Sequence, residues 1–178
     1  KNNILKFIKT FKILLNNEKK NMDNVKIYWD TETTGLNFAT DRIVEIGILV
    51  TQGDNIIEQY QQYINPEKPS DYEAYKVHKL SDEFLSKQPK FSEIYTDILD
   101  IFFKYNPYTV TAHNGDFDSI MLSQEFNRLK ENYGINIGDY IKNTYPEFIP
   151  EKNRTYHFSS KENKYNHTGL SANDLELK

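Results

Sequence analysis

The sequence contains no cysteine among its 178 residues. A disulfide framework is therefore excluded, and so is any metal site built on thiolates. A metal ion in this protein has to be bound by oxygen atoms or by imidazole. The absence of cysteine also suits a reducing compartment, so we expect an intracellular protein, with a virus-encoded or virion-associated protein as the alternative.

Arginine is scarce as well, because three arginines stand against nineteen lysines, and asparagine also occurs nineteen times. We interpret this bias as a mark of AT-rich coding, which says little about chemistry. Long hydrophobic runs are missing too. The apolar stretch near the N-terminus is interrupted by lysines and has no small-residue cleavage site, which argues against a transmembrane segment and a secretory signal there.

Charge is unevenly distributed along the chain. The net charge is −4, but residues 1–21 hold six lysines and one glutamate, so this arm is +5 and leaves −9 for the remaining residues. An acidic body does not exclude nucleic acid, because clustered carboxylates bind Mg²⁺ and the metal then binds phosphate.

The basic arm, residues 1–21, is predicted to be a short amphipathic helix. Its apolar side chains recur at helical spacing and are Ile4, Leu5, Ile8, Phe11 and Leu15. Four interpretations stay open: the arm packs on its own domain, docks on a polymerase or other protein partner, lies on a membrane surface, or touches nucleic acid. Residues 22–178 are expected to form one globular domain.

Apolar runs bounded by turn residues predict three antiparallel strands, over residues 25–30, 41–51 and 56–64. A helix is expected to begin at Ser92, followed by a short strand over residues 109–112. Three meander strands followed by alternating helix and strand indicate an α/β fold. We expect a mixed sheet, an antiparallel meander plus parallel strands, flanked by helices.

A second long helix is predicted over residues 116–132, where Gly134 ends it. Its inward-facing residues are expected to be Phe117, Ile120, Phe126 and Leu129. After Tyr140 the sequence becomes polar, which predicts a long loop that ends in a helix near Ser171.

Two acids follow the first apolar strand, Asp30 and Glu32, within the segment Asp-Thr-Glu-Thr-Thr-Gly-Leu. Residues two apart in an extended chain point to the same face, so both carboxylates are expected to lie together. Hydrolysis of a phosphodiester needs a polarised oxygen, an activated water and a stabilised leaving group. Two divalent ions about 4 Å apart supply all three, and carboxylates suit Mg²⁺ or Mn²⁺.

A third acid, Asp118, lies in the first turn of the helix that follows the strand over residues 109–112. If Phe117 and Met121 face the core, Asp118 is rotated about 100° away from Phe117 and can face the strand that carries Asp30. An acid in a first helical turn is also stabilised by the helix dipole, so Asp118 alone does not indicate a metal site. Together with Asp30 and Glu32 it does.

The segments Asp30–Gly35 and His113–Asp118 closely resemble the first two exonuclease motifs of the DnaQ-like DEDDh family, which includes bacterial proofreading exonucleases. Between them, the stretch Ala74–Ser81 resembles the family's Val-His-Gly region, with Lys79 in place of the glycine. The resemblance implies an RNase H-like fold and a 3′→5′ exonuclease that uses two Mg²⁺ or Mn²⁺ ions, most simply on single-stranded or frayed DNA during replication. RNA is the alternative substrate.

The resemblance also implies roles for individual residues. Asp30 would bind both metals, Glu32 the metal that activates water, and Asp118 the metal on the leaving-group side. The 3′-terminal nucleotide would be held by residues of three segments, which are Thr31, Thr33, Gly35, Leu36, Val77, His78, His113, Asn114 and Phe117.

One part of the family's pattern is missing. The family completes its site with a histidine, the general base, and an aspartate five residues later. Here His157 is followed at that distance by Glu162, and His167 by Ala172, so the general base is not identified. We therefore expect the polypeptide to continue beyond Lys178. The competing hypothesis is an inactive DnaQ-like module kept as a binding or scaffold domain.

Overall fold

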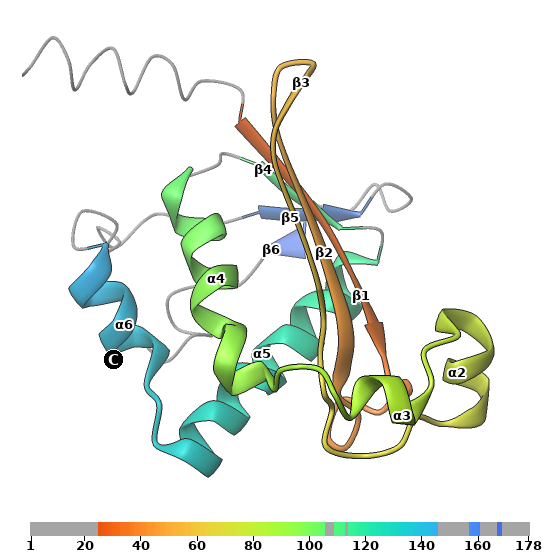
Figure 1. The fold of residues 1–178 in the computed structure, drawn as a ribbon. Coiled ribbons are helices and arrows are strands. Elements are labelled where there is room, and N and C mark those ends of the chain that lie inside the picture. The colour runs from red at the N-terminus through yellow and green to blue at the C-terminus, as the bar shows by residue number, and fades with distance from the viewer. Residues whose placement is uncertain (1–24, 106–108, 113, 146–156, 161–166, 169–178) are drawn as a thin grey trace, which may run out of the picture.

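A mixed six-stranded sheet forms the centre of the protein (Figure 1). The computed structural model describes residues 25–105, 109–112, 114–145, 157–160 and 167–168. The order of strands in the sheet is β3-β2-β1-β4-β5-β6. Their bounds are β1 Val25–Thr33, β2 Ile43–Gln52, β3 Asn55–Tyr63, β4 Thr109–Ala112, β5 His157–Ser160 and β6 His167–Thr168.

The predicted strand arrangement is confirmed. β1 pairs antiparallel with β2, and β2 with β3, which gives the expected meander. β1 pairs parallel with β4, and β4 with β5. Parallel strands run in the same direction, so the C-terminal ends of β1 and β4 lie close together. The last residue pair between them is Trp29 and Ala112.

Five helices accompany the sheet in the described part of the chain. In Figure 1, α4, α5 and α6 lie on one side of the strands, while α2 and α3 stand at the end of the meander where β1 finishes. Their bounds are α2 Tyr72–His78, α3 Asp82–Leu85, α4 Phe91–Lys104, α5 Gly115–Tyr133 and α6 Ile137–Thr144. None of the described helices is long and apolar enough to cross a membrane.

The hydrophobic core lies between the sheet and helices α4, α5 and α6. Alternate residues of β1 are buried, namely Val25, Ile27 and Trp29, as the period of two in a strand requires. From the helices, Ile98 of α4, Met121 of α5 and Ile141 of α6 are each less than 2% exposed. Burial of these side chains supplies the main driving force that holds the helices to the sheet.

Several predicted elements are corrected. The helix expected to begin at Ser92 begins one residue earlier, at Phe91, with Lys90 as its N-cap, whose backbone N–H donates to the Glu93 carboxylate at 2.7 Å. Ile120 was expected to face inward but is 40% exposed. Phe126 and Leu129 are buried as predicted, and Phe117 is partly buried against the core. The other buried side chains of α5 are Asp118, Met121, Leu122 and Glu125.

Helices α2 and α6 were not predicted, because both are short and α2 follows a proline-rich link. The long loop expected after Tyr140 is also wrong in part, since strands β5 and β6 lie within it. The basic arm, the loop containing Pro146 and Pro150, and the helix expected near Ser171 lie outside the described residues.

Candidate active site

Strand β1 carries two of the predicted metal ligands at its C-terminal end. Asp30 is exposed and lies opposite Gly47 of β2, while Glu32 is half-buried and lies opposite Glu45. The pairing register shifts between Glu32 and Thr33, so the regular strand ends directly after the second acid. The two carboxylates therefore lie where β1 ends, and residues two apart in a strand point to the same face.

Helix α5 brings the third acid to the same edge. The short turn after β4 starts α5 at Gly115, and Asp118 falls in its first turn, with its backbone N–H donating to the Asn114 carbonyl at 3.0 Å. Asp118 is only 1% exposed. Its Oδ1 accepts a hydrogen bond from the Thr31 hydroxyl at 2.6 Å and another from the Thr31 backbone N–H at 3.1 Å. Asp118 is thus bound to Thr31, the residue that lies between Asp30 and Glu32 in β1.

Electrostatic strain marks this group of acids. Burial raises the pKa of Asp118 to about 6, with hydrogen bonds from Thr31 opposing the rise and the charge of Asp30 adding to it. Burial also raises the pKa of Glu32, followed by repulsion from Asp30, Glu45 and Asp118. Carboxylates that repel one another in this way are stabilised by a shared cation.

The second oxygen of Asp118, Oδ2, is buried and has no hydrogen-bond partner among the described residues. A buried carboxylate oxygen without a partner is costly, and a bound cation would remove that cost. In the part of the chain that the structure describes, however, no three Asp, Glu or His side chains are drawn together closely enough to form a ready-made metal site. Carboxylates are the ligand type that a divalent ion prefers, but the described side chains do not form a complete site, so the metal site stays a prediction.

The loop after β1 is tightly packed around Gly35. A methyl group added there would lie 2.4 Å from Oδ2 of Asp41 and 2.7 Å from Oδ2 of Asp71. The Thr33 hydroxyl donates to the Gly35 carbonyl at 2.7 Å, and the Asp71 backbone N–H donates to the Thr34 carbonyl at 2.8 Å. Only glycine fits at this position, and the loop is joined to the start of α2.

Some of the residues predicted to hold a nucleotide lie in the loop after β1 and in helix α2. Leu36 is 81% exposed and Val77 is 74% exposed, so both can contact a ligand. His78 is half-buried: its Nδ1 accepts from the Leu80 backbone N–H at 3.0 Å, and its Nε2 is buried with no partner in the described residues. Burial lowers the pKa of His78, which favours the neutral imidazole.

The remaining predicted nucleotide contacts come from the start of α5. Phe117 packs against the core and its ring lies 5.5 Å from that of Phe38, measured between centroids. Asn114 is exposed and is the N-cap residue of α5. His113 lies outside the described residues. The Thr31 hydroxyl and backbone N–H both donate to Asp118, so these two donors are already used within the protein. The nucleotide contact predicted for Thr31 stays a prediction.

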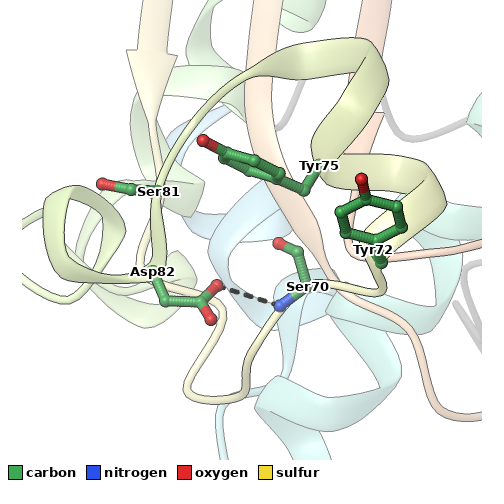
Figure 2. Close-up of a pocket in the computed structure, with 5 residues that line it drawn as sticks. All are labelled: Ser70, Tyr72, Tyr75, Ser81 and Asp82. Carbon is green, nitrogen blue, oxygen red and sulfur yellow. Dashed lines mark hydrogen bonds between the residues drawn. The ribbon is translucent and has the colours of Figure 1, made fainter.

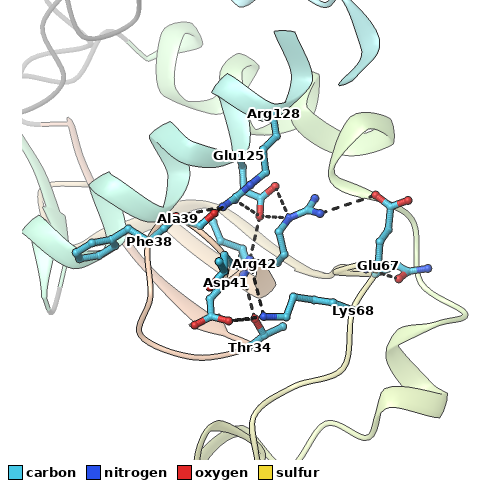
Figure 3. Close-up of polar contacts among 12 residues, drawn as sticks. Thr34, Phe38, Ala39, Asp41, Arg42, Glu67, Lys68, Glu125 and Arg128 are labelled. Atoms are coloured by element: carbon cyan, nitrogen blue, oxygen red, sulfur yellow. Dashed lines mark hydrogen bonds and ion pairs between the residues drawn. The ribbon is translucent and has the colours of Figure 1, made fainter. Parts of the chain in front are cut away.

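Sequence reasoning missed a buried ionic network beside the site (Figure 3). Glu125 of α5 is 1% exposed and accepts hydrogen bonds from Nε of Arg42 at 2.8 and 3.1 Å, and from the Ile43 backbone N–H at 3.1 Å. Arg128 also reaches Glu125, at 3.3 Å, and donates to the carbonyls of Phe38 and Ala39.

Two of the three arginines in the sequence therefore converge on Glu125. Arginine can donate several hydrogen bonds in a fixed plane, which lysine cannot, and Arg42 and Arg128 use this capacity to bind Glu125 and nearby carbonyl groups. The network joins α5, seven residues after Asp118, to the loop between β1 and β2. The scarcity of arginine was the signal that could have identified these residues.

Known proteins resemble this chain along most of its described length. The exonuclease family model, RNase_T, matches residues 27–171. DNA polymerase III subunit epsilon of Rickettsia prowazekii is 39% identical over 107 residues, which cover 59% of this chain and 45% of that protein. The Escherichia coli protein of the same name is 32% identical over 111 residues, 59% of this chain and 44% of that protein. The chain thus spans less than half the length of these curated relatives.

Solved structures of E. coli exonuclease I share the fold. The metal-free complex with single-stranded DNA has a TM-score of 0.55 at 19% identity, over 60% of this chain and 24% of that one. The complex with a dA16 oligonucleotide gives the same values. The prediction of a mixed, RNase H-like α/β fold is confirmed.

Proposed function

This chain belongs to the exonuclease family, and from that premise we propose that it removes nucleoside monophosphates from the 3′ ends of DNA by metal-assisted hydrolysis. The observation that carries the proposal is the position of Asp118. Its carboxylate is buried, accepts hydrogen bonds at Oδ1 from Thr31 of β1, has no hydrogen-bond partner at Oδ2 in the described residues, and interacts electrostatically with Asp30 and Glu32. That arrangement has an obvious use as a metal ligand and little use as a structural contact.

Asp30, Glu32 and Asp118 would hold the metal. When bound, Mg²⁺ or Mn²⁺, as two ions, would polarise the phosphate and lower the pKa of the attacking water. The carboxylates would keep their positions because β1 and α5 pack on the core and are joined by the bond between Thr31 and Asp118. The raised pKa values of Asp118 and Glu32 mean that protons compete with a metal ion for these two carboxylates.

Replication proofreading is the proposed context, because the curated relatives carry the name DNA polymerase III subunit epsilon. Single-stranded or frayed ends are the proposed DNA form, since the neighbouring solved structure is an exonuclease I complex with single-stranded DNA. A polymerase partner is proposed to bind through residues 1–21, and residues 22–178 are proposed as the catalytic unit. The relatives named here are bacterial and lend no support to a viral source; an intracellular location follows from a role in replication.

An inactive binding module is the second candidate function. It is favoured by one observation, that residues 119–178, downstream of Asp118, contain no His-x-x-x-x-Asp sequence. The intact acids and the unsatisfied Asp118 Oδ2 favour the enzyme, because a disused site has no reason to keep a buried carboxylate that is costly to fold.

A 5′-labelled single-stranded DNA oligomer tests the proposal, with the natural full-length protein and its Asp30→Ala variant compared in Mg²⁺ and in Mn²⁺. Stepwise shortening by the wild type that vanishes in the variant supports the exonuclease. No shortening by either protein supports the binding module. An RNA oligomer of the same sequence, run in parallel, separates the two substrate classes, because only RNA brings a 2′-hydroxyl to the site.

A further inference from the structure

Helix α5 is attached to the sheet by two buried acids that lie seven residues apart. Asp118 accepts two hydrogen bonds at Oδ1 from Thr31 of β1. Glu125 accepts one at Oε1 from the backbone N–H of Ile43, the first residue of β2, at 3.1 Å. Seven residues are almost two helical turns, so both acids lie on the same face of α5, about 10 Å apart along its axis. The helix is therefore held to the sheet at two defined points.

The second of these points is an irregularity of the sheet directly beside the end of β1. The pairing of β1 with β2 shifts between Glu32 and Thr33, so β2 carries one extra residue there and Ile43 becomes the partner of Thr33. A bulge of this kind interrupts the regular ladder of backbone hydrogen bonds. The Ile43 N–H at the bulge donates to a side chain, that of Glu125. Glu125 thus contacts the backbone opposite the residue that follows the second acid of β1.

Arg42 connects Glu125 to the end of β1 by a second route (Figure 3). Its Nε donates to both carboxylate oxygens of Glu125, at 2.8 and 3.1 Å. Its backbone is bonded to Thr34, because the Thr34 N–H donates to the Arg42 carbonyl at 2.9 Å and the Arg42 N–H donates to the Thr34 hydroxyl at 3.0 Å. Thr34 follows Glu32 by two residues. The side chain on α5 is therefore linked by polar contacts to the segment that carries the catalytic acids.

Polar contacts of this kind do something that the apolar core does not. Burial of Met121 and Leu122 draws α5 onto the sheet, but the hydrophobic effect has no preferred direction. Hydrogen bonds require defined distances and angles. Apolar residues of similar volume often replace a buried ion pair without loss of stability, so the particular contribution of Glu125 is to fix the geometry of α5.

We propose that Glu125 is a positioning residue for the metal site. By holding α5 to the start of β2, it sets the distance between the Asp118 carboxylate and the two acids of β1. The inference rests on the proposed exonuclease function, in which these three acids hold the metal, and deepens it by adding a residue that contacts neither the metal nor DNA. Groups that orient metal ligands from outside the coordination shell change metal affinity by about tenfold or more when they are removed.

Binding of Mn²⁺ to the natural full-length protein without DNA tests the inference, measured by isothermal titration calorimetry. Asp118→Asn supplies the background from other acidic groups. Glu125→Gln should raise the Kd for Mn²⁺ about tenfold. Arg42→Met should raise it by a similar factor, although it removes a positive charge. Loss of charge alone would have the opposite effect, because removing a nearby cation strengthens the binding of Mn²⁺.

Two controls separate positioning from stability and from charge. Ile98→Ala removes a buried side chain of α4 and should lower thermal stability about as much as Glu125→Gln does. Asp82→Asn removes an exposed carboxylate from a pocket of about 320 Å³ between α2 and the turn that precedes α3, where Figure 2 shows it bound to the Ser70 N–H. Neither control should change the Kd for Mn²⁺ by more than about twofold, since the first leaves the α5 contacts intact and the second removes only a screened charge.

Three results would overturn the inference. They are an unchanged Kd in Glu125→Gln and Arg42→Met, tighter binding of Mn²⁺ by Arg42→Met, and equal weakening by Ile98→Ala. Arg42→Met carries the test alone if circular dichroism shows that Glu125→Gln does not fold. Failure of the wild type to bind Mn²⁺ above the Asp118→Asn background is a different result, which speaks against the metal site and so against the exonuclease proposal itself.

Discussion

The Thr31 hydroxyl donates a hydrogen bond of 2.6 Å to Oδ1 of Asp118, and so joins the strand that carries two of the acids to the helix that carries the third. The Thr31 backbone N–H donates to the same oxygen at 3.1 Å. Both bonds stabilise the ionised carboxylate, while its other oxygen, Oδ2, has no hydrogen-bond partner in the described residues. Thr31 therefore sets both the position and the ionisation of Asp118.

Replacing Thr31 by valine should shift the pH dependence of hydrolysis. The variant loses the hydroxyl bond, so the pKa of Asp118 rises further above its usual value and protons compete with the metal at higher pH. At subsaturating Mg²⁺, the acid limb of the pH–rate profile is expected to move up by about one pH unit, as the loss of a bond to a charged group implies. Thr33→Val, which removes the hydroxyl bond to Gly35 instead, is the control and should leave the limb in place.

The contribution of Asp118 to stability without metal should fall as pH rises through the range from about 4 to 6, in the opposite direction to that of Asp41, Glu58 and Glu67, whose pKa values are lowered by their partners. The folded protein binds a proton at Asp118 up to a pKa of about 6, while the unfolded chain releases it near 3.8, so the folded state binds more protons in this window. From these two values, the loss is about 3 kcal/mol in the free energy of unfolding. Urea denaturation in EDTA at pH 4.5 and 7.5 measures it as the difference between the wild type and Asp118→Asn, and about 2 kcal/mol of the loss falls between these two pH values.

The variant Asp118→Asn is the control for this pH dependence, and its unfolding can be measured without any activity assay. Asp118→Asn should lack this part of the pH dependence and should be more stable than the wild type at pH 7.5 in EDTA, because a neutral side chain avoids the cost of a buried charge. Added Mg²⁺ should stabilise the wild type more than the variant. An identical pH dependence in both proteins would contradict the assignment of Asp118.

Glu125 should be essential for stability. Glu125→Gln keeps the shape of the side chain but leaves Arg42 and Arg128, which are 17% and 14% exposed, without the carboxylate they share. Breaking a buried ion pair at one partner costs about 3 kcal/mol. Glu131→Gln, an exposed acid six residues further along α5, is the matched control and should change stability by less than about 0.5 kcal/mol. Thermal denaturation of the two variants against the wild type provides the comparison.

A methyl group at Gly35 should disturb the loop that follows Glu32. Gly35→Ala places its Cβ against the Asp41 carboxylate, which is buried and fixed by Thr34, Asn37 and Lys68 and cannot move aside easily. We expect a loss of about 1–3 kcal/mol in stability and a larger fall in activity. Gly47→Ala is the control, because nothing lies within 4 Å of an added Cβ there; similar behaviour of the two variants would argue against the tight packing of this loop.

The sequence predicted those parts of the site that depend on local periodicity and spacing. Asp30 and Glu32 share a strand face because of their spacing, and Asp118 faces them because Met121 is buried. The meander followed from three apolar runs with turn residues between them, and the parallel pairing of β4 beside β1 followed from the intervening helix.

Tertiary contacts account for what the sequence did not reveal. Helix α2 has no buried residue and forms because its ends are held by Asp71 and the left-handed Lys79, neither of which is visible as periodicity. Ile120 was predicted to face inward because it is apolar, but it is exposed. Glu125 is charged and yet buried on α5, because Arg42 pairs with its carboxylate. A buried acid paired with a distant arginine leaves no pattern in a single sequence.

Release of mononucleotides from a 5′-labelled single-stranded DNA oligomer by two neighbouring variants tests the central claim most directly. Asp118→Asn and Asp116→Asn each remove one carboxylate from the first turn of α5, but Asp118 is buried against Thr31 and Asp116 is exposed. Asp116→Asn in the natural full-length protein should keep the wild-type rate within about twofold, and Asp118→Asn should lower it at least about a hundredfold, since a metal ligand is lost. Equal rates in the two variants would contradict the assignment of Asp118 as a metal ligand and with it the proposed active site.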